Sequence, residues 1–356
     1  MISIKKIFVD LLNGIDTNFK LDLKFHNVNI EIVSNSANLI KELSRYYSNF
    51  CVSSGTPDIN IVVIEEDCLF PGIKFIKNIP DPPKQKIKEE YCDAPDGRIV
   101  RKILTGMVFI FSTDLNLAVG KCLKNSNQVI NFINNRYIEF MLRKNCLLFH
   151  AAAVSGNSGG AVICGCAGAG KSTLALNLLE YGLYFLSNDR VLAKKLNKDT
   201  VKIYGVPKLP RVNPGTIITS DVLIKILPKD EQKLFKKLNK EDLWELEHKY
   251  DIYIDSIFGS GKFIMETKMK WLFILNWKRN GDIMQIDRIN LQERQDLFPT
   301  FIKSPGLFYT PEKDKIKIDM SGERYLELLK NIDIFEITGE VDFKKASNYI
   351  LKIMSY

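Results

Sequence analysis

The stretch GGAVICGCAGAGKSTLALNLLEYGLYFLSND, Gly159 to Asp189, decides the fold of this chain. It begins with an apolar run that does not alternate, which is typical of a strand buried on both faces of a sheet. A glycine-rich loop follows, and after it a run with leucines at helical spacing that ends at Gly182. A second apolar segment then leads to Asp189. This order predicts strand, loop, helix and strand, and hence an α/β fold.

The loop between the first strand and the helix matches the pattern G-x-x-x-x-G-K-[ST]. Glycines let the backbone N–H groups wrap a phosphate, the lysine reaches the β- and γ-phosphates, and the serine hydroxyl can ligate Mg²⁺. A dinucleotide fingerprint does not fit, because GCAGAG has the order G-x-x-G-x-G. The sequence therefore predicts a site for ATP and Mg²⁺. The predicted nucleotide-binding residues are Gly165, Cys166, Ala167, Gly168, Ala169, Gly170, Lys171, Ser172 and Thr173.

Two side chains outside the loop are candidates for the chemistry. Asp189 follows Lys171 by eighteen residues, enough for one helix and one strand, so we expect it beside the loop. There its carboxylate could ligate Mg²⁺ together with Ser172 or serve as a base, whereas the alternative is an aspartate that caps a turn. His150 follows the apolar residues 146–149, and we expect its ring in the sheet near the phosphate. A hydrogen-bonded core histidine is the alternative there.

A proline-rich loop, GVPKLPRVNPGT, carries Lys208 and Arg211 on a stiff backbone. A cation in such a place could reach charge that develops on the γ-phosphate or bind an anionic acceptor, and two solvated cations are the alternative. Asp251 and Asp255 could extend an acidic site, but we expect them in surface or capping roles.

Composition excludes several classes of protein. The 356 residues carry a formal net charge of +8, but the lysines are interleaved with 42 acidic residues, so no segment resembles a nucleic-acid-binding tail. Seven cysteines form no C-x-x-C pair, which argues against a disulfide framework or a zinc site, and we expect Cys164 and Cys166 to be small buried residues under the loop. No apolar run reaches the roughly 18 residues of a membrane span, and no cleavable leader is evident. We expect a cytoplasmic protein without nucleic-acid or membrane partners.

The pattern of the chain changes near residue 122. Residues 1–122 read mainly as alternating strands with one helix begun by Ser36 or Asn35, and they predict an α+β accessory domain. Residues 123–356 begin with a long amphipathic helix, continue with the apolar strand CLLFHAAAV, and contain the loop described above. They predict the catalytic domain, ending in helix, strand and helix.

Three segments together resemble HPr kinase/phosphorylase, a bacterial serine kinase with a P-loop fold related to phosphoenolpyruvate carboxykinase. They are HAAAV from His150, GCAGAGKST from Gly165, and LSNDRV ending at Val191. Further segments, among them SNSANLIKEL, KEEYCDAPDGRIVRK, YGVPKLPRVNPGT and DLWELEHKYD, resemble the group called HPr kinase-related kinase B.

The resemblance implies a kinase domain of that fold in which the loop holds ATP and Mg²⁺ and His150 supports the catalytic carboxylate. It also implies an assembly of several copies. The sequence departs from the family at one place, because the first of the family's paired aspartates is Asn188 and only Asp189 remains. An amide cannot accept a proton at neutral pH, although it can orient a hydroxyl or a metal-bound water.

The prediction is an ATP- and Mg²⁺-dependent kinase that transfers a phosphoryl group to a hydroxyl, on serine of a protein or peptide. Asp189, His150, Lys171, Asn188 and Arg211 are its predicted catalytic residues, with Ser172 and Asp189 as metal ligands. One alternative is a kinase of a small hydroxylated metabolite on the same fold. Another is a nucleotide-binding regulatory module that has lost transfer.

Overall fold

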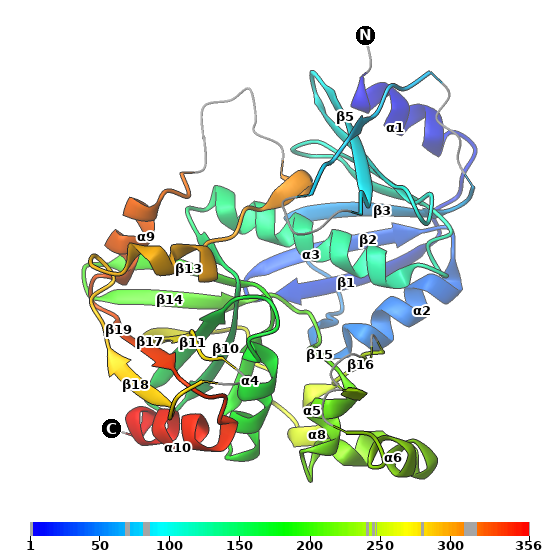
Figure 1. Cartoon of the computed structure of the whole chain (residues 1–356). Coiled ribbons are helices and arrows are strands. Elements are labelled where there is room, and N and C mark those ends of the chain that lie inside the picture. The colour runs from blue at the N-terminus through cyan, green and yellow to red at the C-terminus, as the bar shows by residue number, and fades with distance from the viewer. Residues whose placement is uncertain are drawn as a thin grey trace. The chain divides into compact units, whose positions relative to one another are not determined.

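The computed structural model describes residues 3–67, 72–80, 86–239, 242, 243, 246, 248–278, 281–309 and 319–355, and the chain forms two compact units (Figure 1). The first unit comprises Met1–Lys144 and Pro305–Ile318, and the second comprises Asn145–Ser304 and Asp319–Tyr356. The division thus falls later than the predicted boundary at residue 122. The reason is that helix α3, Ser126–Arg143, packs on the sheet of the first unit, where its Phe132 meets Phe109.

The first unit is built on a mixed eight-stranded sheet with the order β1-β2-β3-β8-β7-β6-β5-β4. Its strands are β1 Phe19–Phe25, β2 Val28–Ser34, β3 Ile59–Glu65, β4 Ile76–Lys77, β5 Glu89–Ala94, β6 Gly97–Lys102, β7 Val108–Phe111 and β8 Asn116–Gly120. Its helices besides α3 are α1 Ile4–Leu12, α2 Ala37–Tyr46 and the short 3-10 turns η1 Ser48–Phe50 and η4 Gly306–Phe308. The predicted alternation is confirmed in β1 and β2, where every second side chain is buried along most of each strand. Ser36 caps α2 as predicted, because its hydroxyl accepts a hydrogen bond from the N–H of Leu39.

Helices cover both faces of this sheet. On β7, Val108 and Ile110 share a core with Ile4 of α1, whereas Phe109 and Phe111 meet Phe132 of α3. Because successive side chains of a strand point to opposite faces, α1 and α3 lie on opposite sides of the sheet. Helix α1, whose N-cap is Ser3, was not predicted.

The second unit contains a nine-stranded sheet and a small two-stranded one. Its strands are β9 Leu147–Phe149, β10 Ala151–Gly156, β11 Gly159–Gly165, β12 Tyr184–Ser187, β13 Val191–Asn197, β14 Thr200–Gly205, β15 Arg211–Val212, β16 Tyr250–Asp251, β17 Glu266–Leu275, β18 Gln285–Arg288 and β19 Asp333–Thr338. Its helices are α4 Lys171–Glu180, α5 Pro214–Ile218, α6 Lys229–Phe235, α8 Ile254–Phe258, α9 Gly322–Leu329 and α10 Phe343–Met354. Its 3-10 turns are η2 Leu223–Ile226 and η3 Gln295–Thr300.

The centre of this sheet is strand β17. Toward its start it pairs antiparallel with β14, and farther along it lies between β11 and β19, parallel to both. Leu272 and Ile274 face a core that includes Tyr325 of α9, whereas Phe273 stacks on Phe335, which in turn meets Tyr349 of α10. Helices therefore cover both faces, as the non-alternating apolar runs predict, and α4 packs against α10 (Figure 1).

The predicted continuous strand CLLFHAAAV is interrupted at His150. Strand β9 before it pairs with β13, whereas β10 after it pairs with β11 and β12. The backbone N–H of His150 donates instead to the carbonyl of Phe301, 2.7 Å away. The histidine thus stands where the chain passes from one set of strand partners to another.

Candidate active site

The glycine-rich loop joins the carboxyl end of β11 to the amino end of α4, as predicted. Gly170 is the N-cap of α4, and no side-chain hydrogen bond caps this helix. Because the first N–H groups of an α-helix lack intrahelical acceptors and carry the positive end of its dipole, they are available to an anion. Strand, loop and helix therefore leave N–H groups at the amino end of α4 that an anion could bind.

Lys171 folds back over this loop. Its Nζ donates hydrogen bonds to the carbonyl oxygens of Gly165 at 2.7 Å and Cys166 at 3.1 Å. Burial lowers the pKa of the Lys171 amine, and the nearby thiols and Asp189 partly offset that effect. A buried ammonium held only by neutral carbonyls is stabilised by an anion, so the lysine is suited to meet a phosphate.

Two aromatic residues that are distant from the loop in the sequence pack against it. The indole Nε1 of Trp277 donates to the carbonyl of Ala169 at 2.8 Å, and its ring meets Phe343 edge-on with centroids 5.2 Å apart. Phe343 also fills the space where a side chain at Gly170 would project, since a Cβ there would lie 2.5 Å from the ring. Gly170 has φ of +90°, so glycine is required there for both conformation and space.

Ser172 contacts Asn188, not Asp189. The Ser172 hydroxyl donates to Oδ1 of Asn188 at 2.6 Å, and Asn188 is buried. The neighbouring Thr173 exchanges a hydrogen bond with Thr216 of α5 at 3.0 Å. The amide of Asn188 therefore lies against the hydroxyl expected to ligate a metal.

Asp189 lies against a different set of groups. Its Oδ1 is 3.4 Å from Nε2 of His150 and 3.5 Å from Nζ of Lys303, and its Oδ2 is 3.9 Å from Nε of Arg190. The residue adopts φ of +66°, which aspartate tolerates better than most side chains, in the turn between β12 and β13. Ser187 supports this turn by donating to the carbonyl of Arg190 at 2.5 Å. The structure thus brings His150 and Asp189 together, as expected from the sequence.

The cations around Asp189 keep it ionised. Burial alone would raise the pKa of this carboxyl, but the hydrogen bond from His150 lowers it. The positive charges of Lys303, Lys208 and Arg190, in that order, lower it further. The net result is an Asp189 pKa well below the ordinary value, so the group is a carboxylate throughout the physiological range.

Lys303 and Arg190 were not among the predicted site residues. Lys303 is 114 residues from Asp189 in the chain, and no local motif surrounds it, so only the fold reveals it. Arg190 stands within the segment LSNDRV, directly after the aspartate, and that adjacency was the available sign.

Other predicted residues lie elsewhere. Arg211 pairs with Asp251 across β15 and β16 at 3.2 Å, and both side chains are substantially exposed. Asp255 caps the turn after α8, since its carboxylate accepts from the N–H groups of Gly261 and Phe263. Surface and capping roles for the two aspartates are thus confirmed. Of the two cysteines at the loop, Cys164 is buried as predicted, but Cys166 is exposed because the loop projects beyond the sheet.

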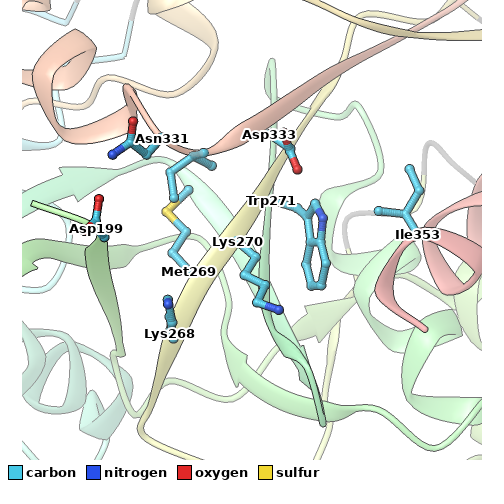
Figure 2. A pocket seen from close by; sticks show the side chains of 9 residues that line it. Asp199, Lys268, Met269, Lys270, Trp271, Asn331, Asp333 and Ile353 are labelled. Atoms are coloured by element: carbon cyan, nitrogen blue, oxygen red, sulfur yellow. The ribbon is translucent and has the colours of Figure 1, made fainter. Parts of the chain in front are cut away.

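A separate hollow of about 520 Å³ opens at the opposite edge of the same sheet (Figure 2). Strand β17 contributes Met269 and Trp271 to it, and Asp333 begins β19 there. The loop from Gly165 instead follows the carboxyl end of β11, which is level with Leu275. The hollow is therefore distinct from the site around Lys171 and Asp189.

The residues present fit a metal that arrives with a nucleotide. Within the described residues, no cluster of three or more His, Cys, Asp or Glu side chains could hold a metal ion. A serine hydroxyl, an amide oxygen and one nearby carboxylate make too few ligands for a resident cage, but Mg²⁺ in nucleotide sites commonly takes few protein ligands and completes its shell with phosphates and water.

Of the helices that the structure describes, none is long and apolar enough to cross a membrane.

Comparison with known proteins gives little further guidance. No profile of a known protein family matches the sequence, and no curated protein matches it. Among solved structures, the HPr(Ser) kinase/phosphatase from Coxiella burnetii aligns over 58% of this chain and 87% of its own, at 10% sequence identity and a TM-score of 0.28. Similarity at that level establishes neither a common fold nor a common activity.

Proposed function

We propose that the second unit is an ATP-dependent kinase that transfers the γ-phosphoryl group to a hydroxyl, on serine of a protein or peptide. One observation carries the proposal, namely the ionised Asp189 beside a phosphate-type loop that holds Lys171. The loop and Lys171 supply donors for the phosphates, and Asp189 supplies a carboxylate held by His150 at 3.4 Å. Phosphoryl transfer needs little more from a protein than positioning and charge stabilisation.

In the proposed reaction the acceptor oxygen forms a bond to the γ-phosphorus, and the bond from that phosphorus to the β–γ bridging oxygen breaks. ADP leaves, and the acceptor proton passes to the carboxylate of Asp189. Because the pKa of Asp189 is low, the carboxylate is a weak base that orients the hydroxyl and accepts its proton only late in the reaction, a step that an amide at this position could not perform. That suffices for a loose transition state, in which the proton is lost late.

Lys171 and Ser172 would act on the nucleotide. Lys171 would exchange the carbonyls of Gly165 and Cys166 for phosphate oxygens, which are better partners for an ammonium. Ser172, oriented by Asn188, would present its hydroxyl oxygen to Mg²⁺. When bound, Mg²⁺ supplies charge neutralisation on the phosphates.

Asn188 favours one of the two rival functions. An amide beside the serine leaves the proposed metal position with one negative charge fewer than an aspartate would provide, so a module that binds nucleotide without transfer remains the second candidate. A kinase of a small metabolite differs from the first proposal only in the acceptor.

The test measures binding and transfer separately. Calorimetry with Mg²⁺ and a non-hydrolysable ATP analogue should detect binding to the wild type and to Asp189→Asn. Transfer of labelled phosphate to cell-extract components should be lost in Asp189→Asn by about 10²- to 10⁴-fold, the usual range for a proton-accepting group. Equal transfer by the variant would refute the role of Asp189, and tight binding with no labelled product in the wild type would favour the regulatory module. Phosphoamino-acid analysis of the product separates protein from metabolite acceptors.

A further inference from the structure

Three cations surround Asp189 in addition to Lys171. We call Arg190, Lys208 and Lys303 the cation cluster. Arg190 follows Asp189 in the turn after β12, Lys208 lies in the loop after β14, and Lys303 lies after η3. Lys303 and Arg190 approach Asp189 to 3.5 and 3.9 Å, and Lys208 is within electrostatic range of both Asp189 and Arg190.

The charge of the cluster is not balanced by the described residues. Among the residues that the structure describes, Asp189 is the carboxylate that acts on Arg190 and Lys303, and Lys208 shares it, with Asp251 as a weaker neighbour that already pairs with Arg211. The carboxylate of Asp189 thus balances part of the charge of all three cations of the cluster. All three are partly withdrawn from water, and burial lowers the pKa of each.

A hydrogen-bond donor in the cluster also lacks an acceptor. The Nη1 atom of Arg190 is buried, and no hydrogen-bond partner for it is found among the described residues. Leaving a buried charged donor unsatisfied is costly, so such a donor marks a place where a ligand oxygen can bind. A guanidinium and two ammonium groups are the usual partners of phosphate and carboxylate oxygens.

The position of the cluster assigns the anion to the acceptor. The nucleotide phosphates have Lys171 and the amino end of α4, whereas the cluster surrounds the carboxylate that orients the acceptor hydroxyl. We therefore infer that the acceptor carries a carboxylate or phosphate group close to its reactive hydroxyl, and that Arg190, Lys208 and Lys303 bind this group. The inference rests on the proposed kinase function and narrows its substrate class.

Inorganic phosphate is the probe for this subsite. The full chain is first saturated with Mg²⁺ and a non-hydrolysable ATP analogue, which occupies the loop and includes the γ-position, and phosphate is then titrated by calorimetry. We expect one phosphate to bind to the loaded chain. In the double variant Lys208→Gln, Lys303→Gln the affinity should fall at least tenfold, whereas Lys225→Gln, which removes an exposed lysine of the same unit, should change it less than twofold.

A second variant, Asp189→Asn, tests the inference even if the double variant fails to fold. Asp189→Asn removes the carboxylate that competes for the cluster, so it should raise the phosphate affinity of the loaded chain. Absence of phosphate binding to the loaded wild type would overturn the inference and mean that the cluster serves the γ-phosphate itself. Unchanged affinity in the double variant would overturn it as well. Failure of the analogue to bind would instead refute the proposed kinase function, which the first step of the experiment reports independently.

Discussion

The two edges of the sheet in the second unit differ in how their charges are satisfied. At the edge opposite the loop, the hollow of Figure 2 contains Asp333, which is paired with Arg288, and Lys270, whose ammonium lies 5.5 Å from the centre of the Trp271 ring. At the carboxyl edge, the described hydrogen bonds of the Lys171 ammonium go to neutral carbonyls, and Asp189 is shared among several cations. The hollow therefore contains a carboxylate that is paired and a lysine that lies over an aromatic ring, whereas at the carboxyl edge several cations share one carboxylate. Charged groups that converge without matched partners are therefore a better indication of a candidate active site in this unit than the volume of a hollow.

After the loss expected for Asp189→Asn, the next largest effect comes from removing the ammonium of Lys171 at the carboxyl edge. Lys171→Ala should lower phosphoryl transfer by about 10²- to 10³-fold, because a single preorganised donor to developing charge is worth that much. Nucleotide-analogue affinity measured by calorimetry should fall as well. Retention of both in the variant would contradict a phosphate-binding role for this loop.

His150→Ala sharpens the comparison by changing one partner of Asp189. The loss of a hydrogen bond to a charged group should reduce transfer by about tenfold. Because that bond lowers the pKa of Asp189, its loss raises this pKa, and the acid limb of the rate profile should move to higher pH. A lower rate with an unshifted acid limb would show that His150 acts only through the packing of the chain.

Asn188→Asp should have a smaller and opposite effect. An added carboxylate beside Ser172 supplies the charge that the amide lacks, so the Mg²⁺ concentration that half-saturates analogue binding should fall by about tenfold. Asn188→Ala is the control, since it removes the hydrogen bond to the Ser172 hydroxyl without adding charge. If Asn188→Asp left the Mg²⁺ dependence unchanged, a metal position beside this residue would be ruled out.

The smallest effect is expected at the opposite edge. Lys270→Ala removes a cation from the wall of the hollow, and transfer and analogue affinity should both stay within twofold of the wild type. A loss comparable with that of Lys171→Ala would mean that the two edges are functionally joined and that the contrast between them is misplaced.

The parts of the site that lie within one continuous segment could be predicted from the sequence. The order of β11, loop, α4 and β12 followed from glycine spacing and apolar periodicity, and the offset of Asp189 from Lys171 predicted a position beside the loop. The contact between His150 and Asp189 was implied by the family resemblance. Local patterns also predicted the cap at Ser36 and the alternation in β1 and β2.

Features that depend on contacts between residues far apart in the chain could not be predicted from the sequence. Lys303 reaches Asp189 only because the chain after η3 returns to the site, and Phe343 meets Gly170 only because α10, distant in the sequence, packs against α4. The break at His150 depends on which strands pair on either side of it, since CLLFHAAAV is apolar throughout except for that residue. The helix α3 was predicted, but its membership in the first unit depends on packing against β3 and β8.

The hydrogen bond from the indole of Trp277 to the glycine-rich loop has a practical consequence. Because Nε1 of Trp277 donates to the carbonyl of Ala169, the emission of this tryptophan depends on the conformation of the loop that we propose holds the nucleotide. A chain in which Trp244 and Trp271 are replaced by phenylalanine would retain one emitter, placed at that loop. The intrinsic fluorescence of Trp277 would then report the binding and release of a ligand in real time, without any added label.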